Sequence, residues 1–153
     1  MPDRRSRIAL TDEEQRDLLH EAKTLYIASI GPDGRPHLVP MWFAPDDEGL
    51  VAFTTYGTSQ KVRNLERDPR ITVLVEAGDA YEELRGVSID GRAEIVRDLH
   101  VTARVRELAG AQHAGQPRPE ADPDAEPPAA VAKRVTVRVH PERVRSWDHR
   151  KLR

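Results

Sequence analysis

Apolar and polar positions repeat with two different periods along the chain, and the two periods separate expected strands from expected helices. Short apolar runs bounded by glycine, proline and aspartate are typical of strands, whereas apolar residues spaced three or four apart are typical of helices. The expected strands are residues 25–30, 35–44, 50–55, 71–76, 85–96 and 135–140. The expected helices are residues 12–23, a short segment between Thr58 and Asp68, and residues 98–109.

Several of these elements carry end signals. Thr11 and Glu14 form a capping-box pattern, with a hydroxyl at the cap and a carboxylate three residues later, so a helix should begin at about Asp12. Proline disfavours the α conformation in the residue before it, so Asp68-Pro69 should end the short helix. Gly91 lies inside an expected strand and indicates a bulge or a bend there.

Six short strands joined mostly by tight turns predict a mostly β fold with appended helices, in which six antiparallel strands form a barrel or a strongly curled sheet. Pro36 and Pro40 cannot donate to a strand ladder, so the strand over 35–44 should have a free edge. We expect one domain over 1–153, with its core at about 24–147. The polar segment over 110–130, rich in proline, alanine and glycine, is expected to be a mobile excursion.

Composition excludes several classes of function. The 153 residues are 38% hydrophobic and 33% charged, with a net charge of -2 and no apolar run long enough to span a membrane. We therefore expect a soluble, cytoplasmic protein that binds neither nucleic acid nor membrane. The chain has no cysteine, which excludes thiolate catalysis and thiolate metal sites. No zinc-protease, serine-hydrolase, dinucleotide or Walker motif occurs, so no metal is expected.

The run TSQKVRNLERDPR, residues 58–70, places two hydroxyls and a lysine at the start of the short helix. The first backbone N–H groups of a helix lack partners, and they carry the positive end of the helix dipole. Lys61 lies in the first turn and can add a charge-assisted hydrogen bond worth about 1.5 to 3 kcal/mol, so an anion fits this place. The alternative is a capped surface helix with a solvated lysine, and spacing alone does not decide between the two.

The order of the parts resembles a known family. Three stretches carry the resemblance: TLYIASIGPDGRPHLVPMWF, LVAFTTYGTSQKVRNLERDPRITVLVE and LRGVSIDGRAEIV, which together cover most of residues 24–96. They resemble the split β-barrel flavin and deazaflavin oxidoreductases of the pyridoxamine 5'-phosphate oxidase-like superfamily, whose fold is the FMN-binding split barrel. The run KVRNLERDPR, residues 61–70, looks most like the branch that uses the deazaflavin coenzyme F-420 rather than FMN.

The resemblance implies a homodimer with a cofactor cleft at the interface between subunits and a small-molecule substrate. Four residues would hold the cofactor phosphate, with Arg63 as a further cation, and three residues of the strand over 35–44 would lie along its ring. Solvent exposure is an equal alternative for Arg63. Core or dimer-interface packing is an alternative for Trp42 and Phe43, and at least an equal one for Phe43. Asn64 and Leu65 are expected to be structural. The implied cofactor-binding residues are Pro40, Met41, Trp42, Thr54, Thr55, Ser59, Lys61 and Arg63.

The expected activity is hydride transfer from reduced coenzyme F-420 to an electrophilic small molecule such as an enone, quinone or tetrapyrrole. The alternatives are an FMN-binding oxidoreductase of the same fold, and a non-catalytic protein that binds flavin, deazaflavin or haem. The C-terminal run PERVRSWDHRKLR matches the substrate-gripping tail of the vitamin B6 oxidases only loosely, around Trp147 and Arg150. His37, Tyr56 and Tyr81 are candidate proton donors, but none stands out, so the catalytic residue is left unassigned.

Overall fold

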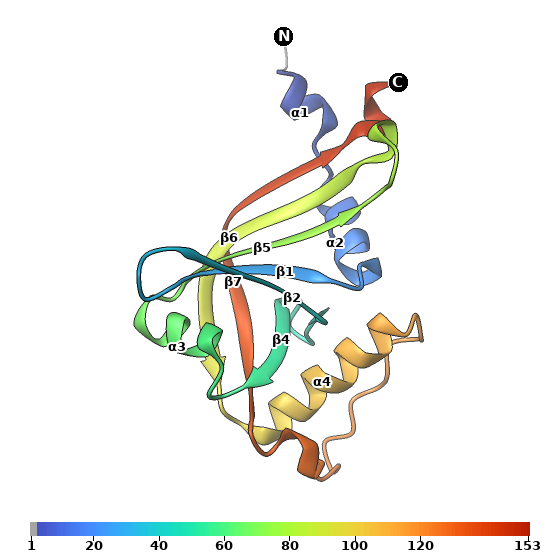
Figure 1. The fold of residues 1–153 in the computed structure, drawn as a ribbon. Helices are drawn as coiled ribbons and strands as arrows, with labels where there is room; N and C mark the ends of the chain where they lie inside the picture. The colour runs from blue at the N-terminus through green and yellow to red at the C-terminus, as the bar shows by residue number, and fades with distance from the viewer. Residues whose placement is uncertain (1–2) are drawn as a thin grey trace.

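The computed structural model describes residues 3–153 as one antiparallel sheet, curled into a split barrel with helices around it (Figure 1). No helix in this described part of the chain is both long and apolar enough to cross a membrane. The helices are α1 Arg4–Ile8, α2 Asp12–Glu21, α3 Gln60–Arg67 and α4 Leu99–His113, with short 3-10 turns η1 Tyr81–Glu83, η2 Ala129–Val131 and η3 His149–Leu152. The strands are β1 Leu25–Ile30, β2 Pro36–Met41, β3 Ala44–Pro45, β4 Val51–Tyr56, β5 Arg70–Ala77, β6 Arg85–Val96 and β7 Arg134–Asp148.

The sheet has seven strands in the order β2-β1-β5-β6-β7-β4-β3, one more than the six expected. The extra strand arises because the segment expected as a single strand over 35–44 is divided at Trp42 and Phe43. Its first part, β2, forms one edge of the sheet, and its second part, β3, forms the other. Phe43 is fully buried at the crossing, so burial of its ring holds the chain where it passes from edge to edge. The expected free edge at Pro36 and Pro40 is confirmed, since among the described residues 3–153 β2 pairs only with β1.

The strand β6 has the bounds expected from the sequence, and its partner β7 is much longer than expected. The β6–β7 register shifts between Asp90 and Gly91, which confirms the expected irregularity, and a Cβ at Gly91 would clash with the carbonyl oxygen of His140. The C-terminal run PERVRSWDHRKLR, which was compared with the B6 oxidases, forms the last part of β7 up to Asp148. The ring of Trp147 packs on Gly86, where a Cβ would clash with it, so this tryptophan anchors the tail to its own chain.

Two helices lie against the sheet, and their ends differ from expectation. The capping box of α2 is present, with Glu14 N–H donating to Thr11 Oγ1, but the helix ends at Glu21 rather than Lys23. The helix α4 runs to His113, past the expected end at Ala109. The amide Nε2 of Gln112 donates to the carbonyl oxygens of Leu19 and Ala22 at 2.9 and 2.7 Å, a tertiary contact that extends α4 into the segment expected to be an excursion.

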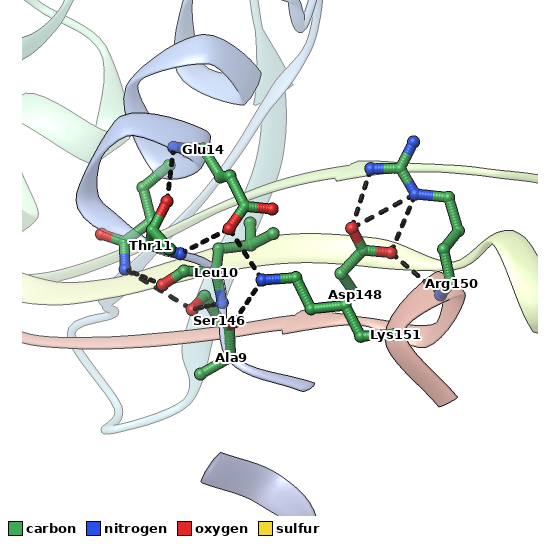
Figure 2. A network of polar contacts seen from close by, with 9 residues as sticks. Ala9, Leu10, Thr11, Glu14, Ser146, Asp148, Arg150 and Lys151 are labelled. Atoms are coloured by element: carbon green, nitrogen blue, oxygen red, sulfur yellow. Dashed lines mark hydrogen bonds and ion pairs between the residues drawn. The ribbon is translucent and has the colours of Figure 1, made fainter. Parts of the chain in front are cut away.

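The two ends of the chain are joined at the end of the sheet farthest from α4 (Figure 1). Figure 2 shows Lys151 Nζ donating to Glu14 Oε1 at 2.7 Å and to the carbonyl oxygen of Ala9 at 2.9 Å. Nearby, Leu10 N–H donates to Ser146 Oγ at 2.9 Å. These bonds fasten the segment before α2 and its first turn to the end of β7 and to η3.

Replacing Lys151 by methionine should lower the melting temperature at neutral pH by about 1 to 3 °C, because the ion pair is partly exposed. The hydrogen bond from Lys151 lowers the pKa of Glu14 from its ordinary 4.5, so the stabilisation is complete above that value and is lost as pH falls through the lowered pKa. Thermal melts at several pH values should show the wild-type and mutant curves converging in acid. Lys23→Met, on an exposed lysine, is the control, and a mutant deficit that persists unchanged at low pH would contradict this account.

Candidate functional site

The end of β4 and the start of α3 bring two hydroxyls, those of Thr55 and Ser59, together with the ammonium of Lys61. Thr54 and Thr55 are buried on β4, with exposed fractions of 8% and 3%, and a tight turn leads to Ser59, the N-cap of α3. The hydroxyl of Ser59 makes no capping bond to the helix and instead accepts from Thr55 Oγ1 at 3.4 Å. Lys61 Nζ donates to Thr55 Oγ1 at 2.9 Å. The side chain of Lys61 therefore turns back toward the end of β4 rather than outward into solvent.

Lys61 lies beside a second cation. Burial lowers the pKa of Lys61, and the positive charge of Arg134 lowers it further. Within residues 3–153, neither Lys61 nor Arg134 forms an ion pair with a carboxylate. Two neighbouring cations without a carboxylate partner form an electropositive place that an anion would stabilise.

Sequence reasoning missed Arg134. It begins β7 and lies opposite Tyr56 in the β4–β7 register, with its guanidinium carbon 4.5 Å from the centre of the Tyr56 ring. This stacking fixes a long side chain at the end of β4, beside Lys61. The only signal in the sequence is a basic residue at the start of an alternating valine run, and the pairing partner of that run lies about 80 positions earlier in the chain.

The structure does not bring Arg63 to this group. Lys61 and Arg63 are two positions apart on α3, and a rotation of about 100° per residue places them on nearly opposite sides of the helix. Arg63 is exposed. The next residue of α3, Asn64, is fully buried. Its side chain donates to Ser29 Oγ at 3.1 Å and accepts from Gln60 Nε2 at 2.8 Å. With Leu65 also buried, both residues expected to be structural pack inside the fold.

A cleft of about 740 Å³ adjoins the lysine site, within the size range of small-molecule sites. Four of the predicted residues, Pro40, Met41, Trp42 and Thr54, line one part of it, and Arg134 also lines it. The rest of the lining comes from α4 and the segment that follows it: Arg106, Glu107, Ala109, Gly110, Ala111, Gln116, Pro117 and Pro119. Shaping of the substrate pocket was expected from the tail and the 110–130 segment, and residues of that segment do line the cleft, whereas Arg106, Glu107 and Ala109 of α4 were missed because only tertiary packing brings them beside β2 and β4.

The adjacent aromatic residues Trp42 and Phe43 lie in different environments. Phe43 is in the core, whereas Trp42 is 55% exposed and stacks on His113 with ring centres 3.8 Å apart. This stack joins β2's end to the end of α4. Of the candidate proton donors, Tyr81 packs beside His149 near the chain ends, and Tyr56 lies under Arg134. His37 is half-buried on β2, and neither it nor the two tyrosines lines the cleft.

Comparison with known proteins agrees with this architecture. The model of the pyridoxamine 5'-phosphate oxidase family matches residues 11–148. The chain is 30% identical to the pyridoxine/pyridoxamine 5'-phosphate oxidase of Rubrobacter xylanophilus, over 93% of this chain and 73% of that protein.

Solved structures show the same similarity. A conserved hypothetical protein from Mycobacterium tuberculosis is 41% identical, with a TM-score of 0.84, covering 99% of this chain and 92% of its own. A protein described as an F420 reductase is 29% identical, with a TM-score of 0.67, covering 88% of this chain and 98% of its own. The fold is thus that of flavin-type oxidoreductases, and the chain belongs to the pyridoxamine 5'-phosphate oxidase family.

Proposed function

We propose that this protein is an oxidoreductase that uses coenzyme F-420, and that the cofactor phosphate binds between Lys61 and Arg134. The observation that carries the proposal is the pair of cations with no carboxylate partner in the described chain, held beside the hydroxyls of Thr55 and Ser59. Phosphate oxygens would accept charge-assisted hydrogen bonds from both cations. The similarity to an F420 reductase favours a deazaflavin over the other phosphate-bearing cofactors.

The flat part of the cofactor would lie along Pro40, Met41 and Trp42. These residues end β2, whose outer side has no neighbouring strand, so backbone groups there are free to bond ring heteroatoms. When bound in reduced form, the deazaflavin would supply a hydride to an electrophilic carbon of an enone, quinone or tetrapyrrole, a proton from solvent would complete the reduction, and the cofactor would leave oxidised by two electrons. The protein's part is to hold the ring and to orient the acceptor.

We further propose that two chains form a homodimer that completes the cleft. Large apolar side chains are exposed on β2 and directly after it, with Leu38 66% and Trp42 55% exposed. An exposed apolar strand edge is a surface that another chain commonly covers.

Leu38→Glu is expected to convert the dimer into a monomer, because it places a charge in the middle of this apolar edge. Light scattering coupled to gel filtration measures the change directly. Val144→Glu, on another exposed apolar residue away from β2, is the matched control and should leave the dimer intact. A wild-type protein that is already monomeric at high micromolar concentration would contradict the homodimer.

FMN binding in the same place is the alternative, because FMN also presents a phosphate and a flat ring to these residues. Fluorescence titrations with coenzyme F-420 and with FMN, followed by competition between the two, test the proposal. We expect F-420 to bind tighter and to be displaced only by excess FMN. The reverse order would replace the deazaflavin by FMN, and tight binding of either without turnover of any electrophile would favour a non-catalytic carrier.

A further inference from the structure

The part of the cleft formed by α4 and the following segment is not used by the proposed cofactor. We call it the α4 wall, made of Arg106, Glu107, Ala109, Gly110, Ala111, Gln116, Pro117 and Pro119. If the ring lies along Pro40–Trp42, a hydride acceptor must approach from the remaining space. The α4 wall is therefore the surface whose chemistry selects the acceptor, an assignment that rests on the proposed function.

Charge on the α4 wall is unbalanced. Glu107 accepts a hydrogen bond from Arg104 Nη1 at 3.3 Å, and the same guanidinium holds Asp47 at 2.8 and 3.0 Å. Arg104 thus binds the carboxylates of both Glu107 and Asp47. Arg106 is exposed, lines the cleft and forms no ion pair within the part of the chain that the structure describes. The wall therefore presents one uncompensated guanidinium to the cleft.

Residues 109–111 of the α4 wall have small side chains or none, and hydrogen bonds hold the segment that follows α4. Gly110 lies between two alanines, and a Cβ added to it would meet no atom within 4 Å, so space is open in front of this turn of α4. The following segment is fastened by Arg118, whose Nη1 donates to the carbonyl oxygen of Pro45 at 2.9 Å and whose Nη2 donates to Asp47 Oδ1 at 3.3 Å. This attachment places Pro117 and Pro119 on the cleft. The result is a preformed floor for a flat or extended apolar group.

We propose that the α4 wall binds the hydride acceptor, and that the acceptor carries a carboxylate held by Arg106 while its unsaturated part lies on the floor at Gly110. Arginine binds carboxylates through two parallel hydrogen bonds, which fixes orientation as well as position. A single cation beside small apolar residues matches an acceptor with one anionic end and one conjugated end.

The first test compares cinnamic acid with its methyl ester as acceptors for wild type and Arg106→Gln. Because the ester is intrinsically more electrophilic, each acceptor is compared between proteins rather than with the other acceptor. Arg106→Gln should lower kcat/KM for the acid at least tenfold, as expected for a lost charge-assisted bond, and should leave the ester within about twofold. The dissociation constant of coenzyme F-420 should not change. Arg16→Gln, an exposed arginine on α2, is the charge-matched control.

The second test fills the open space. Gly110→Leu should raise KM for acid and ester alike, because Gly110 lines the cleft and a Cβ there would meet no atom within 4 Å, which leaves room for the longer side chain to occupy the cleft. Leucine is also the better helix former, by up to about 1 kcal/mol, so the melting temperature should hold or rise. A loss of activity accompanied by loss of stability would contradict the steric explanation.

A third measurement needs no cofactor. Millimolar 3-phenylpropanoic acid, which cannot be reduced, should raise the melting temperature of wild type but not of Arg106→Gln. If wild type binds neither deazaflavin nor flavin, the proposed function fails while this shift still tests Arg106. Equal shifts in both proteins, or no shift in either, would overturn the carboxylate site. The carboxylate site would also be overturned if Arg106→Gln bound F-420 more weakly while its kcat/KM for cinnamic acid stayed unchanged, because Arg106 would then hold the cofactor.

Discussion

Lys61→Met is expected to weaken coenzyme F-420 binding at least tenfold, about 1.4 kcal/mol, and up to about 100-fold. The reason is the loss of a charge-assisted hydrogen bond, worth about 1.5 to 3 kcal/mol, from a half-buried ammonium that already points at Thr55. Equilibrium fluorescence titration measures the effect. Arg134→Met should produce a loss of similar size, whereas Arg63→Met, on the exposed side of α3, should cost less than tenfold.

The same lysine should be unfavourable for stability. Burial and Arg134 lower its pKa, which means that the folded protein binds the lysine proton less tightly than the unfolded chain does. That cost is present at neutral pH and disappears as pH rises above the ordinary lysine value of 10.5. Lys61→Met should therefore keep or raise the melting temperature at pH 7 while it loses cofactor affinity. A structural lysine would behave in the opposite way, since its removal would lower stability and spare binding.

Phe43→Ala is expected to destabilise the fold by about 3 to 5 kcal/mol, the largest stability loss predicted for this chain. Its ring is fully buried where the chain crosses from one sheet edge to the other, so truncation leaves a cavity at the closure of the barrel. Urea unfolding should show the midpoint falling with little change in slope. The loss should also reduce cofactor affinity, because Trp42 and Met41 precede the crossing directly.

Leu99→Ala is the control for this prediction, since Leu99 is 40% exposed at the start of α4 and should change stability by less than about 0.5 kcal/mol. If Phe43→Ala unfolds at the wild-type midpoint, the crossing does not depend on burial of that ring. The explanation given for the division of β2 from β3 would then be wrong.

Local patterns predicted the elements that local chemistry determines. The capping box at Thr11, the strand Arg85–Val96 and the irregularity at Gly91 can all be read from nearby residues, and the structure has each of them. The free edge followed from Pro36 and Pro40 for the same reason, because a missing N–H is a property of the residue itself.

Other features depend on partners distant in sequence and could not be predicted in the same way. The extension of α4 to His113 rests on bonds from Gln112 to carbonyls of α2, about 90 positions away. The division of the strand over 35–44 follows from barrel closure, since β2 and β3 must reach opposite edges. In both cases tertiary packing overrode the local signal.

The candidate site divides along the same line. Ser59 and Lys61 were found together in the run over 58–70, and the family resemblance added Thr54 and Thr55, which are close to that run in the sequence. Arg134 comes to them only through the β4–β7 pairing, and Arg106 only through the packing of α4 beside the cleft. Neither residue has a local motif that distinguishes it from the chain's other arginines.

The central claim is that the phosphate of a redox cofactor lies between Lys61 and Arg134, and a crystal structure of the protein soaked or grown with coenzyme F-420 tests it most directly. The account predicts phosphate oxygens within hydrogen-bond distance of Lys61 Nζ and of the Arg134 guanidinium, with the ring along Pro40–Trp42. A cofactor bound elsewhere, or a cleft in which these two cations contact only protein atoms while the cofactor is bound, would contradict it.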